Sequence, residues 1–315
     1  MRRYIKKKLV EIINSLKEGH ALLSQLYEKN EQEALLNLLQ ELQETAIAVG
    51  AEIESAEGET HPTVGVLEEY CELLWQCGEE KSIERQRKIC KQLEKKCIRI
   101  ENSVKWDIKE QYDVVFMPYK ASMWDSLESV WLAAKEDKNC NCYVMPIPYF
   151  DRNSDRTFGK MHYEGDLYPY DVPITSYLSY DLKENCPEVI VIHNPYDEYN
   201  YVTSVHPDYY SSKLKEYTEM LVYIPYFVTM GHVQEEMCVA QGVINADLVV
   251  VQSEEVRQEY LQALEVHLNP VKSEDIRTYF EQKIVALGSP KIDKVMNTKK
   301  EDIILPKDWE EKIYG

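Results

Sequence analysis

Short apolar segments that alternate with helical segments dominate the chain from residue 112 onward. Each is four to six residues long and nearly continuous in Val, Ile, Leu, Met or Tyr: Tyr112–Met117, Cys142–Ile147, Val189–Ile192, Leu221–Ile224, Leu248–Val251 and Ile284–Leu287. Apolar runs of this length, separated by helices, are typical of parallel strands covered on both faces. The pattern therefore predicts an α/β domain with an open, mostly parallel, Rossmann-like sheet.

The first third of the chain has a helical pattern only. Apolar residues recur at helical spacing in four segments, within residues 5–26, 35–53, 64–77 and 82–105. The last segment follows a heptad with Cys90 and Cys97 at core positions and Ile83 at the first one. Two arrangements fit this pattern: four antiparallel helices that form a bundle, or a hairpin of long helices that serves as a dimerisation arm. We expect a helical segment over 1–105, the Rossmann-like domain over 106–298, and a linker towards a further domain over 299–315.

The net charge and the cysteine spacing restrict the partners and cofactors that the chain is expected to bind. The chain has 36 Lys and Arg against 55 Asp and Glu, a net charge of −19, which repels nucleic-acid phosphate, so no nucleic-acid partner is expected. Its eight cysteines include no CxxC and no zinc-finger spacing, and the first strand–helix turn lacks GxGxxG, so we expect no metal and no dinucleotide cofactor.

Location follows from the lack of a long apolar segment. No run approaches the ~18 apolar residues of a transmembrane helix, so we expect a cytoplasmic protein. The chain begins with a basic amphipathic segment that contains Arg2, Arg3, Lys6, Lys7 and Lys8. This segment fits either a solvated helix face or a peripheral contact with the inner face of an anionic membrane.

Four of the predicted strands run into a Pro-Tyr dipeptide at or just after their carboxyl ends. The tyrosines of these dipeptides are Tyr119, Tyr149, Tyr196 and Tyr226. Proline ends a strand ladder because it has no N–H, and open parallel sheets bind ligands beyond the carboxyl edge. The dipeptides predict an aromatic rim around a ligand site. They fit equally well as strand ends that pack against a neighbouring domain.

A long segment after the second predicted strand, Phe150–Val172, has no regular pattern and is expected to be a loop. It gathers the basic residues Arg152, Arg156, Lys160 and His162 in an otherwise acidic chain. Such a group is able to hold a phosphate or a carboxylate. Four acidic residues lie among them, so a solvated loop with internal ion pairs is the alternative.

Two histidines at predicted strand ends are candidates for general-base chemistry. His193 follows a strand directly, with Asp197 four residues later, and His232 follows Gly231 where a helix is able to begin. A histidine with a carboxylate partner titrates near neutral pH and is suited to take up a proton. The alternatives are a structural hydrogen bond for His193 and a surface cap for His232.

The end of the α/β region resembles a known family. The sequence ADLVVVQSEEVRQEYLQAL, followed by the motif GSPKID, is similar to the end of the N-terminal domain of the CDP-glycerol glycerophosphotransferases, the teichoic-acid polymerase family. That domain closes in Gly-x-Pro-(Arg/Lys)-x-Asp, which Gly288, Pro290, Lys291 and Asp293 match. The resemblance implies half of a GT-B fold, in which a second domain carries most of the nucleotide-linked donor.

The resemblance also implies a function, with one departure. The family has a His-Gly-x-Pro motif whose His is taken as the base, whereas the corresponding stretch Tyr223–Thr229 contains no His. The implied function is the acceptor side of a transferase that moves glycerol phosphate or a sugar from a CDP-glycerol-like donor to a phosphate-bearing hydroxyl acceptor in cell-envelope polymer synthesis. Such a half would be weak or inactive without the second domain.

Residue roles follow from this expectation. We expect the base among His232, His193 and Asp197, the acceptor phosphate on Arg152, Arg156, Lys160 and His162, and the acceptor packed on Tyr149, Tyr196 and Tyr226. A different class of function is left open: a non-catalytic module with a helical arm, which forms a homodimer or binds a ligand or partner protein.

Overall fold

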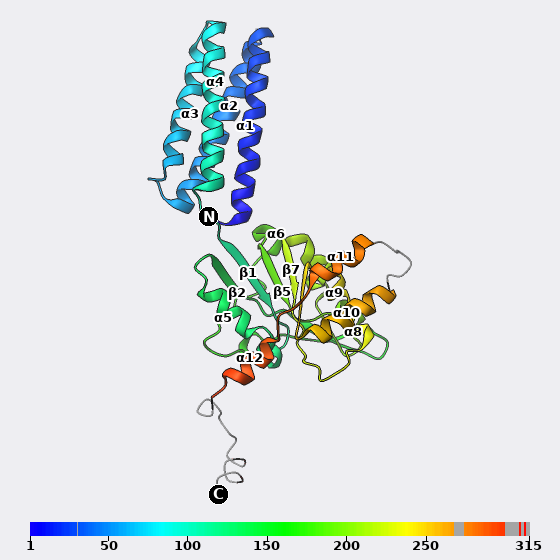
Figure 1. Cartoon of the computed structure of the whole chain (residues 1–315). Coiled ribbons are helices and arrows are strands. Elements are labelled where there is room, and N and C mark those ends of the chain that lie inside the picture. Colours follow the sequence, from blue (N-terminus) through cyan, green and yellow to red (C-terminus); the bar gives the residue numbers. More distant parts are fainter. Residues whose placement is uncertain (30, 268–273, 300–308, 310–311, 313–315) are drawn as a thin grey trace. The chain divides into compact units, whose positions relative to one another are not determined.

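The computed structural model of the chain describes residues 1–29, 31–267, 274–299, 309 and 312. Its contacts divide it into two compact units, Met1–Gln111 and Tyr112–Gly315 (Figure 1). The division lies a few residues beyond the expected boundary because residues 107–111 bond to the start of the chain, for example through Arg3 N–H to Gln111 O at 2.9 Å. The expected linker, 299–315, lies almost entirely outside the described residues.

The first unit is a four-helix bundle formed within one chain. Its helices are α1 (Arg3–Lys29), α2 (Gln32–Glu57), α3 (Pro62–Glu79) and α4 (Ile83–Trp106). Each contacts its two neighbours, so that α1 packs on α2 and α4, and α3 packs on the same two helices. The bundle alternative is therefore the one observed. Cys90 and Cys97 are core residues, as predicted. Ile83 is not, because it opens the first turn of α4 and is 50% exposed.

The second unit is built on a parallel sheet, which confirms the predicted α/β class. Its strands lie in the order β2-β1-β5-β7-β8-β9, and every neighbouring pair is parallel. Their bounds are β1 Tyr112–Met117, β2 Cys140–Val144, β5 Val189–Ile192, β7 Met220–Tyr223, β8 Leu248–Val251 and β9 Ile284–Ala286. The chain runs outward from β1 to β2 and then returns to the other side of β1 at β5. The order thus reverses between β1 and β5, and ligands bind at such switch points.

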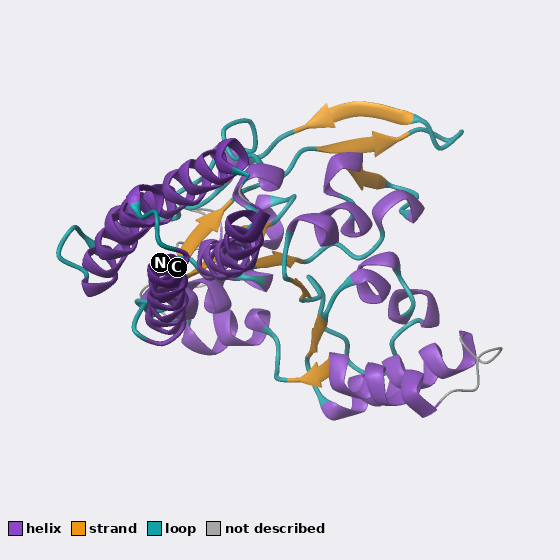
Figure 2. Cartoon of the chain, turned by 90° about the horizontal axis from the view of Figure 1, so that it is seen from above, coloured by secondary structure: helices purple, strands orange, loops and turns teal. Residues whose placement is uncertain are grey.

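Both faces of this sheet are buried. Val115, Ile190 and Leu221 belong to one apolar cluster, whereas Val114 and Val191 belong to the other. Successive strand residues point to opposite faces, so continuous apolar runs are required. Figure 2 distinguishes the strands from the helices and loops around them.

The remaining elements of the second unit are mostly short. Its α-helices are α5 Glu128–Glu136, α6 Leu182–Asn185, α7 Ser211–Leu214, α8 Glu235–Cys238, α9 Gln241–Asn245, α10 Glu254–His267, α11 Glu274–Lys283 and α12 Pro290–Asn297. Its 3₁₀ turns are η1 Ala121–Ser126, η2 Gly165–Leu167, η3 Asp197–Tyr199, η4 Pro207–Tyr209 and η5 Lys215–Tyr217.

A second, smaller sheet corrects the expectation of a loop over Phe150–Val172. Strands β3 (Tyr149–Arg152), β4 (Phe158–His162) and β6 (Thr203–Val205) pair antiparallel in the order β4-β3-β6. The tight connection between β3 and β4 includes Asn153 N–H bonded to Thr157 O at 3.1 Å. Arg156 adopts a left-handed φ of 68° there. Most of the basic group therefore lies on a hairpin.

Candidate functional site

The switch point of the large sheet is held together by His193. The backbone N–H of Tyr119, beyond β1, donates to Nε2 of His193, beyond β5, at 3.2 Å. Nε2 is therefore unprotonated, and Nδ1–H faces Ser126 Oγ at 2.9 Å. Ser126 Oγ in turn donates to Met123 O at 2.7 Å. This series of hydrogen bonds connects the ends of both strands to each other and to the turn η1.

His193 is consequently a poor catalytic base. It is completely buried, and this burial, with a smaller effect from Lys291, lowers its pKa from 6.5 to about 3. Both ring nitrogens are engaged inside the protein. The geometry matches the structural alternative, and we withdraw His193 from the proposed bases.

Asp197 does not pair with His193. Its buried carboxylate accepts hydrogen bonds from the N–H and Oγ of Ser211, at 2.9 and 2.5 Å. Burial raises the pKa of Asp197 to about 6. This carboxylate therefore holds the first residue of α7, and the expected His–Asp pair is not formed.

The tyrosines of the Pro-Tyr dipeptides gather at the switch point. The rings of Tyr119 and Tyr149 meet edge to face, with centroids 5.4 Å apart. His193 lies between Tyr119, at 5.4 Å, and Tyr226, at 6.1 Å. Burial raises the pKa of Tyr196, and the neighbouring hydroxyl of Tyr226 raises it further. We call Tyr119, Tyr149, Tyr196 and Tyr226 the tyrosine cluster. Tyr119 and Tyr149 are buried, so only its other two members approach a rim.

A second imidazole, His162, lies beside this cluster. Its ring stacks on Tyr149 with centroids 5.1 Å apart and an interplanar angle of 18°. Its Nε2 is 2.7 Å from Asp151 Oδ2, and 29% of its side chain is exposed. When Nε2–H donates to Asp151, Nδ1 is the basic nitrogen. His162 therefore has the partner and the exposure that His193 lacks.

Glu164 attaches the hairpin to the start of η1. Its Oε1 accepts from the hydroxyl of Tyr149 at 2.6 Å. Its Oε2 accepts from the backbone N–H of Ala121 at 2.8 Å. These two hydrogen bonds to Glu164 position the hairpin, and with it the His162–Asp151 pair, relative to the switch point.

Lys120 supplies a positive charge at the same place. Its Nζ lies 5.5 Å from the ring centroid of Tyr119 and 5.1 Å from that of Tyr149, within the range of cation–π attraction. In the part of the chain that the structure describes, no carboxylate pairs with this ammonium. Lys160 is exposed on β4, in the part of the strand where the β3–β4 register shifts. These two lysines are available to an anion.

The expected arginine pair is used differently. The guanidinium of Arg152 donates to two backbone carbonyls, of Arg156 at 2.7 Å and of Glu198 at 2.9 Å, and it lies over the ring of Phe158. The guanidinium of Arg156 lies 4.8 Å from the ring centroid of Tyr201. Arg152 therefore holds the hairpin together, and the four basic residues do not form one phosphate site.

His232 is also separate from the tyrosine cluster. Its exposed ring places Nδ1 3.2 Å from Oε1 of Glu259, in α10. Among the described residues, no hydrogen bond or ring contact links His232 to the four tyrosines. The next helix, α8, begins only at Glu235 and has four residues, so the expected helix start at Gly231-His232 is not found.

The GSPKID motif docks the last described helix. Gly288 has a φ of 104°, which favours glycine at the turn into α12. Both carboxylate oxygens of Asp125 are 2.7 Å from Lys291 Nζ, and Ser129 Oγ donates to Asp293 at 2.7 Å. The lysine and aspartate of the motif therefore attach α12 to η1 and α5.

Sequence reasoning missed Lys120, Asp151 and Glu164. Lys120 directly follows the first Pro-Tyr dipeptide, which was a usable signal. The other two join the site only through the β3–β4 hairpin.

Comparisons with known proteins add no identity. No protein-family model matches the chain, and a search of curated proteins finds no match. Within the described ranges, no group of three or more His, Cys, Asp or Glu side chains is arranged to hold a metal ion. The helices of those ranges include none with the length and apolar character needed to cross a membrane.

Proposed function

We propose that the second unit is the acceptor side of a GT-B-like transferase, which moves glycerol phosphate or a sugar from a CDP-glycerol-like donor to a hydroxyl of a phosphate-bearing acceptor. One observation carries this proposal: an Asp-oriented imidazole lies on the tyrosine cluster together with a lysine that has no carboxylate partner among the described residues. A basic nitrogen for a hydroxyl proton and a charge for a phosphate are what such a reaction requires.

The proposed step uses residues of this chain as follows. Lys120 and Lys160 hold the acceptor phosphate, and the acceptor packs on the exposed parts of Tyr196 and Tyr226. Nδ1 of His162 takes the proton of the acceptor hydroxyl. At the same time the oxygen of that hydroxyl bonds to the phosphorus of the glycerol phosphate group of the donor. The phosphoanhydride bond to the nucleotide breaks, and the nucleoside monophosphate leaves with the electron pair. Asp151 stabilises the imidazolium that forms.

Binding of glycerol 3-phosphate, a hydroxyl acceptor with a phosphate, tests the anion site. Lys120→Met should weaken binding about tenfold in calorimetric titration, the effect of losing one charge-assisted contact. Lys138→Met is the matched control, because Lys138 is exposed and lies before β2. Absence of binding to the wild-type protein, or equal effects of the two substitutions, contradicts the proposal.

Transfer itself distinguishes catalysis from binding. Incubation of the protein with CDP-glycerol and glycerol 3-phosphate should release CMP slowly, because the second domain is expected to carry most of the donor. Mass spectrometry detects the CMP. His162→Gln should reduce this release by about 10²–10⁴, the usual contribution of a general base, whereas His232→Gln should leave it unchanged. Equal rates for wild type and His162→Gln remove His162 from the mechanism.

A second function is a non-catalytic module, and the burial of His193 together with the lack of His-Gly-x-Pro favours it. In that case glycerol 3-phosphate binds but no CMP is released. A homodimer through the helical unit stays a prediction; since the four helices close on themselves within one chain, such a dimer would use their outer surface.

Cytoplasmic location and contact with an anionic membrane surface are also proposals. One basic residue of the first turn is used internally: Lys6 is buried, and its Nζ donates to Ile108 O at 2.9 Å. Sedimentation with anionic vesicles tests the membrane contact, and the absence of binding at low salt argues against it.

A further inference from the structure

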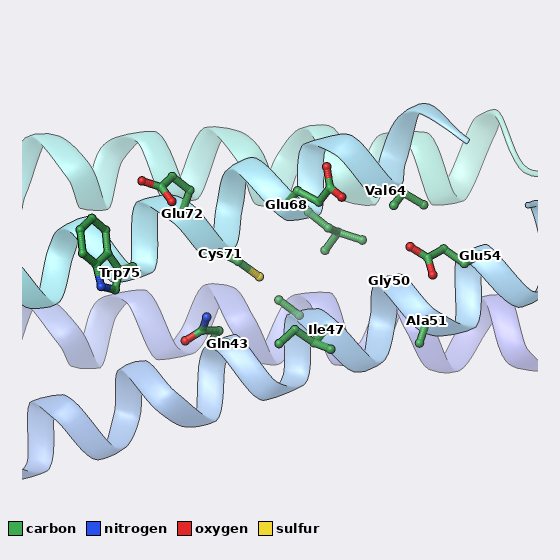
Figure 3. Close-up of a pocket in the computed structure, with 12 residues that line it drawn as sticks. Gln43, Ile47, Gly50, Ala51, Glu54, Val64, Glu68, Cys71, Glu72 and Trp75 are labelled. Atoms are coloured by element: carbon green, nitrogen blue, oxygen red, sulfur yellow. The ribbon is translucent and has the colours of Figure 1, made fainter. Parts of the chain in front are cut away.

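An open groove runs along the bundle between α2 and α3, with a volume of ≈ 480 Å³. Figure 3 shows side chains from both helices pointing towards it, with Trp75 and Gln43 at one end and Val64, Ala51 and Glu54 at the other. It lies wholly within the first unit and belongs to no part of the site described above.

The floor of the groove is made of small residues. Ala46, Gly50 and Ala51 of α2 line it, with Val64 and Leu67 on α3. A Cβ at Gly50 would have only Leu67 Cδ1 within 4 Å, at 3.8 Å. The space above Gly50 is therefore not filled by the side chains of the bundle itself.

Large apolar side chains flank this floor and are exposed. Ile47 is 58% exposed and Trp75 is 60% exposed. Tryptophan beside a hollow is the residue type that most often dominates the energy of a protein interface. A contiguous apolar strip bordered by polar residues is typical of an interaction surface.

The charged border of the groove is entirely acidic. Glu54, Glu68 and Glu72 line it, and no Lys or Arg does. Among the described residues, none of these three carboxylates forms an ion pair; Glu72 accepts a hydrogen bond from the Gln76 amide at 3.0 Å. The surface is thus complementary to a partner with basic residues beside an apolar strip.

The length of the groove indicates the shape of that partner. Its lining extends over residues 43–54 of α2 and 64–75 of α3. At 1.5 Å per residue this corresponds to about 17 Å, or three helical turns. A shallow apolar groove of three turns is the surface on which an amphipathic helix lays its apolar face.

We infer that the groove between α2 and α3 binds an amphipathic helix of another protein, with an apolar stripe flanked by Lys or Arg. A second copy of this chain fits less well. A two-fold interface places the same patch on both sides, so the glutamates would face one another and repel. This inference is independent of the proposed transferase function.

A designed peptide tests the groove in the full chain. The probe is a fluorescein-labelled helix of about 14 residues, with Leu along one face and Lys on both flanks; its counterpart has Glu in place of Lys. Binding is measured by fluorescence anisotropy at about 50 and about 300 mM salt, on both sides of physiological screening.

Matched variants separate the groove from general attraction to an acidic protein. Trp75→Ala should weaken the Lys peptide about tenfold, as loss of an interface hot spot does. Trp106→Ala should change it less than about twofold, because Trp106, 80% exposed, ends α4 away from the groove lining. Replacement of Glu54, Glu68 and Glu72 by Gln should weaken binding mainly at low salt, whereas the same change at Glu11, Glu18 and Glu94 should not.

Three results would overturn the inference. These are equal binding of the Lys and Glu peptides, equal effects of Trp75→Ala and Trp106→Ala, and a wild-type dimer in sedimentation velocity that Trp75→Ala abolishes. The last result would assign the groove to a second copy of the chain. Circular dichroism of each variant verifies the fold, which exposed positions are not expected to disturb.

Discussion

Replacement of His193 by Gln should change how the stability of the second unit depends on pH. Burial lowers the pKa of His193 to about 3 in the folded protein, from 6.5. A histidine with a lowered folded pKa is protonated first in the unfolded chain. Its contribution to stability is therefore complete above about pH 6.5 and is lost as the pH falls towards the folded value. For these two pKa values, the loss between pH 8 and pH 5 is about 2 kcal/mol.

Other groups titrate in the same range, so wild type alone is not informative. His20, in the bundle, has its pKa lowered to about 4 by burial and acts in the same direction. The pKa of Asp197 is raised to about 6, which has the opposite sign and stabilises the fold as the pH falls through that value. The difference between wild type and His193→Gln removes both effects.

The assay is urea unfolding at pH 8 and pH 5, followed by tryptophan fluorescence. Trp124 and Trp131 are 3% and 2% exposed and so report on the second unit. The stability difference between wild type and His193→Gln should shrink by about 2 kcal/mol at pH 5. His206→Gln, at a partly exposed histidine of the same unit, is measured alongside as a control. If the His193 difference is constant between pH 8 and pH 5, the ring is not buried and neutral, and His193 returns as a candidate base.

Three further predictions concern the packing around the switch point, each measured by urea unfolding. Gly242→Ala should destabilise the protein by about 1–3 kcal/mol, because its Cβ would lie 2.7 Å from the backbone Cα of Pro195. The control Gly65→Ala lies in α3, where the new Cβ has nothing within 4 Å, and should stabilise the protein by about 0.5–1 kcal/mol. Equal effects of the two substitutions would contradict the close packing at Gly242. Glu164→Gln should destabilise by about 1–2 kcal/mol, since two donors lose their charged acceptor; no change would mean that the hairpin is not attached through this carboxylate. Lys291→Met should cost less than about 1 kcal/mol because its ion pair is partly exposed, and a larger loss would give the motif lysine a role beyond docking α12.

The strands of the large sheet were predictable because burial on both faces leaves a direct mark on the sequence. Tyr112–Met117, Val189–Ile192 and Leu248–Val251 have the predicted bounds. The second strand is displaced towards the N-terminus and ends at Val144, before Pro146, which has no N–H for the ladder. Met145 and Ile147 are nevertheless buried. The N–H of Met145 donates to Phe116 O in β1, and the N–H of Ile147 donates to Pro118 O just beyond it, which explains why these residues have the composition of a strand.

The small sheet was not predictable in the same way. Strands β3 and β4 have only four and five residues, mix apolar and polar side chains, and are mostly half-buried or exposed, so no continuous apolar run marks them. The turn between them contains Asn153, Ser154 and Asp155, residue types that favour turns and that were a usable signal for a hairpin.

The candidate site was predictable in place but not in composition. Proline after each strand end implies that the following tyrosines share one sheet edge, and they do. Whether a histidine at that edge faces solvent or the interior depends on neighbours distant in sequence, such as Tyr119 and Ser126 for His193. The pairing of His162 with Asp151 was not predictable for the same reason, because it forms only when the hairpin brings β3 and β4 together.

Hydrogen exchange with and without glycerol 3-phosphate tests the central claim most directly, that the switch-point edge of the large sheet is a binding site. The account predicts slower exchange in peptides that cover residues 117–122, 149–164 and 193–197, with no change in the helical bundle. Protection located elsewhere, or none at saturating ligand, would contradict it.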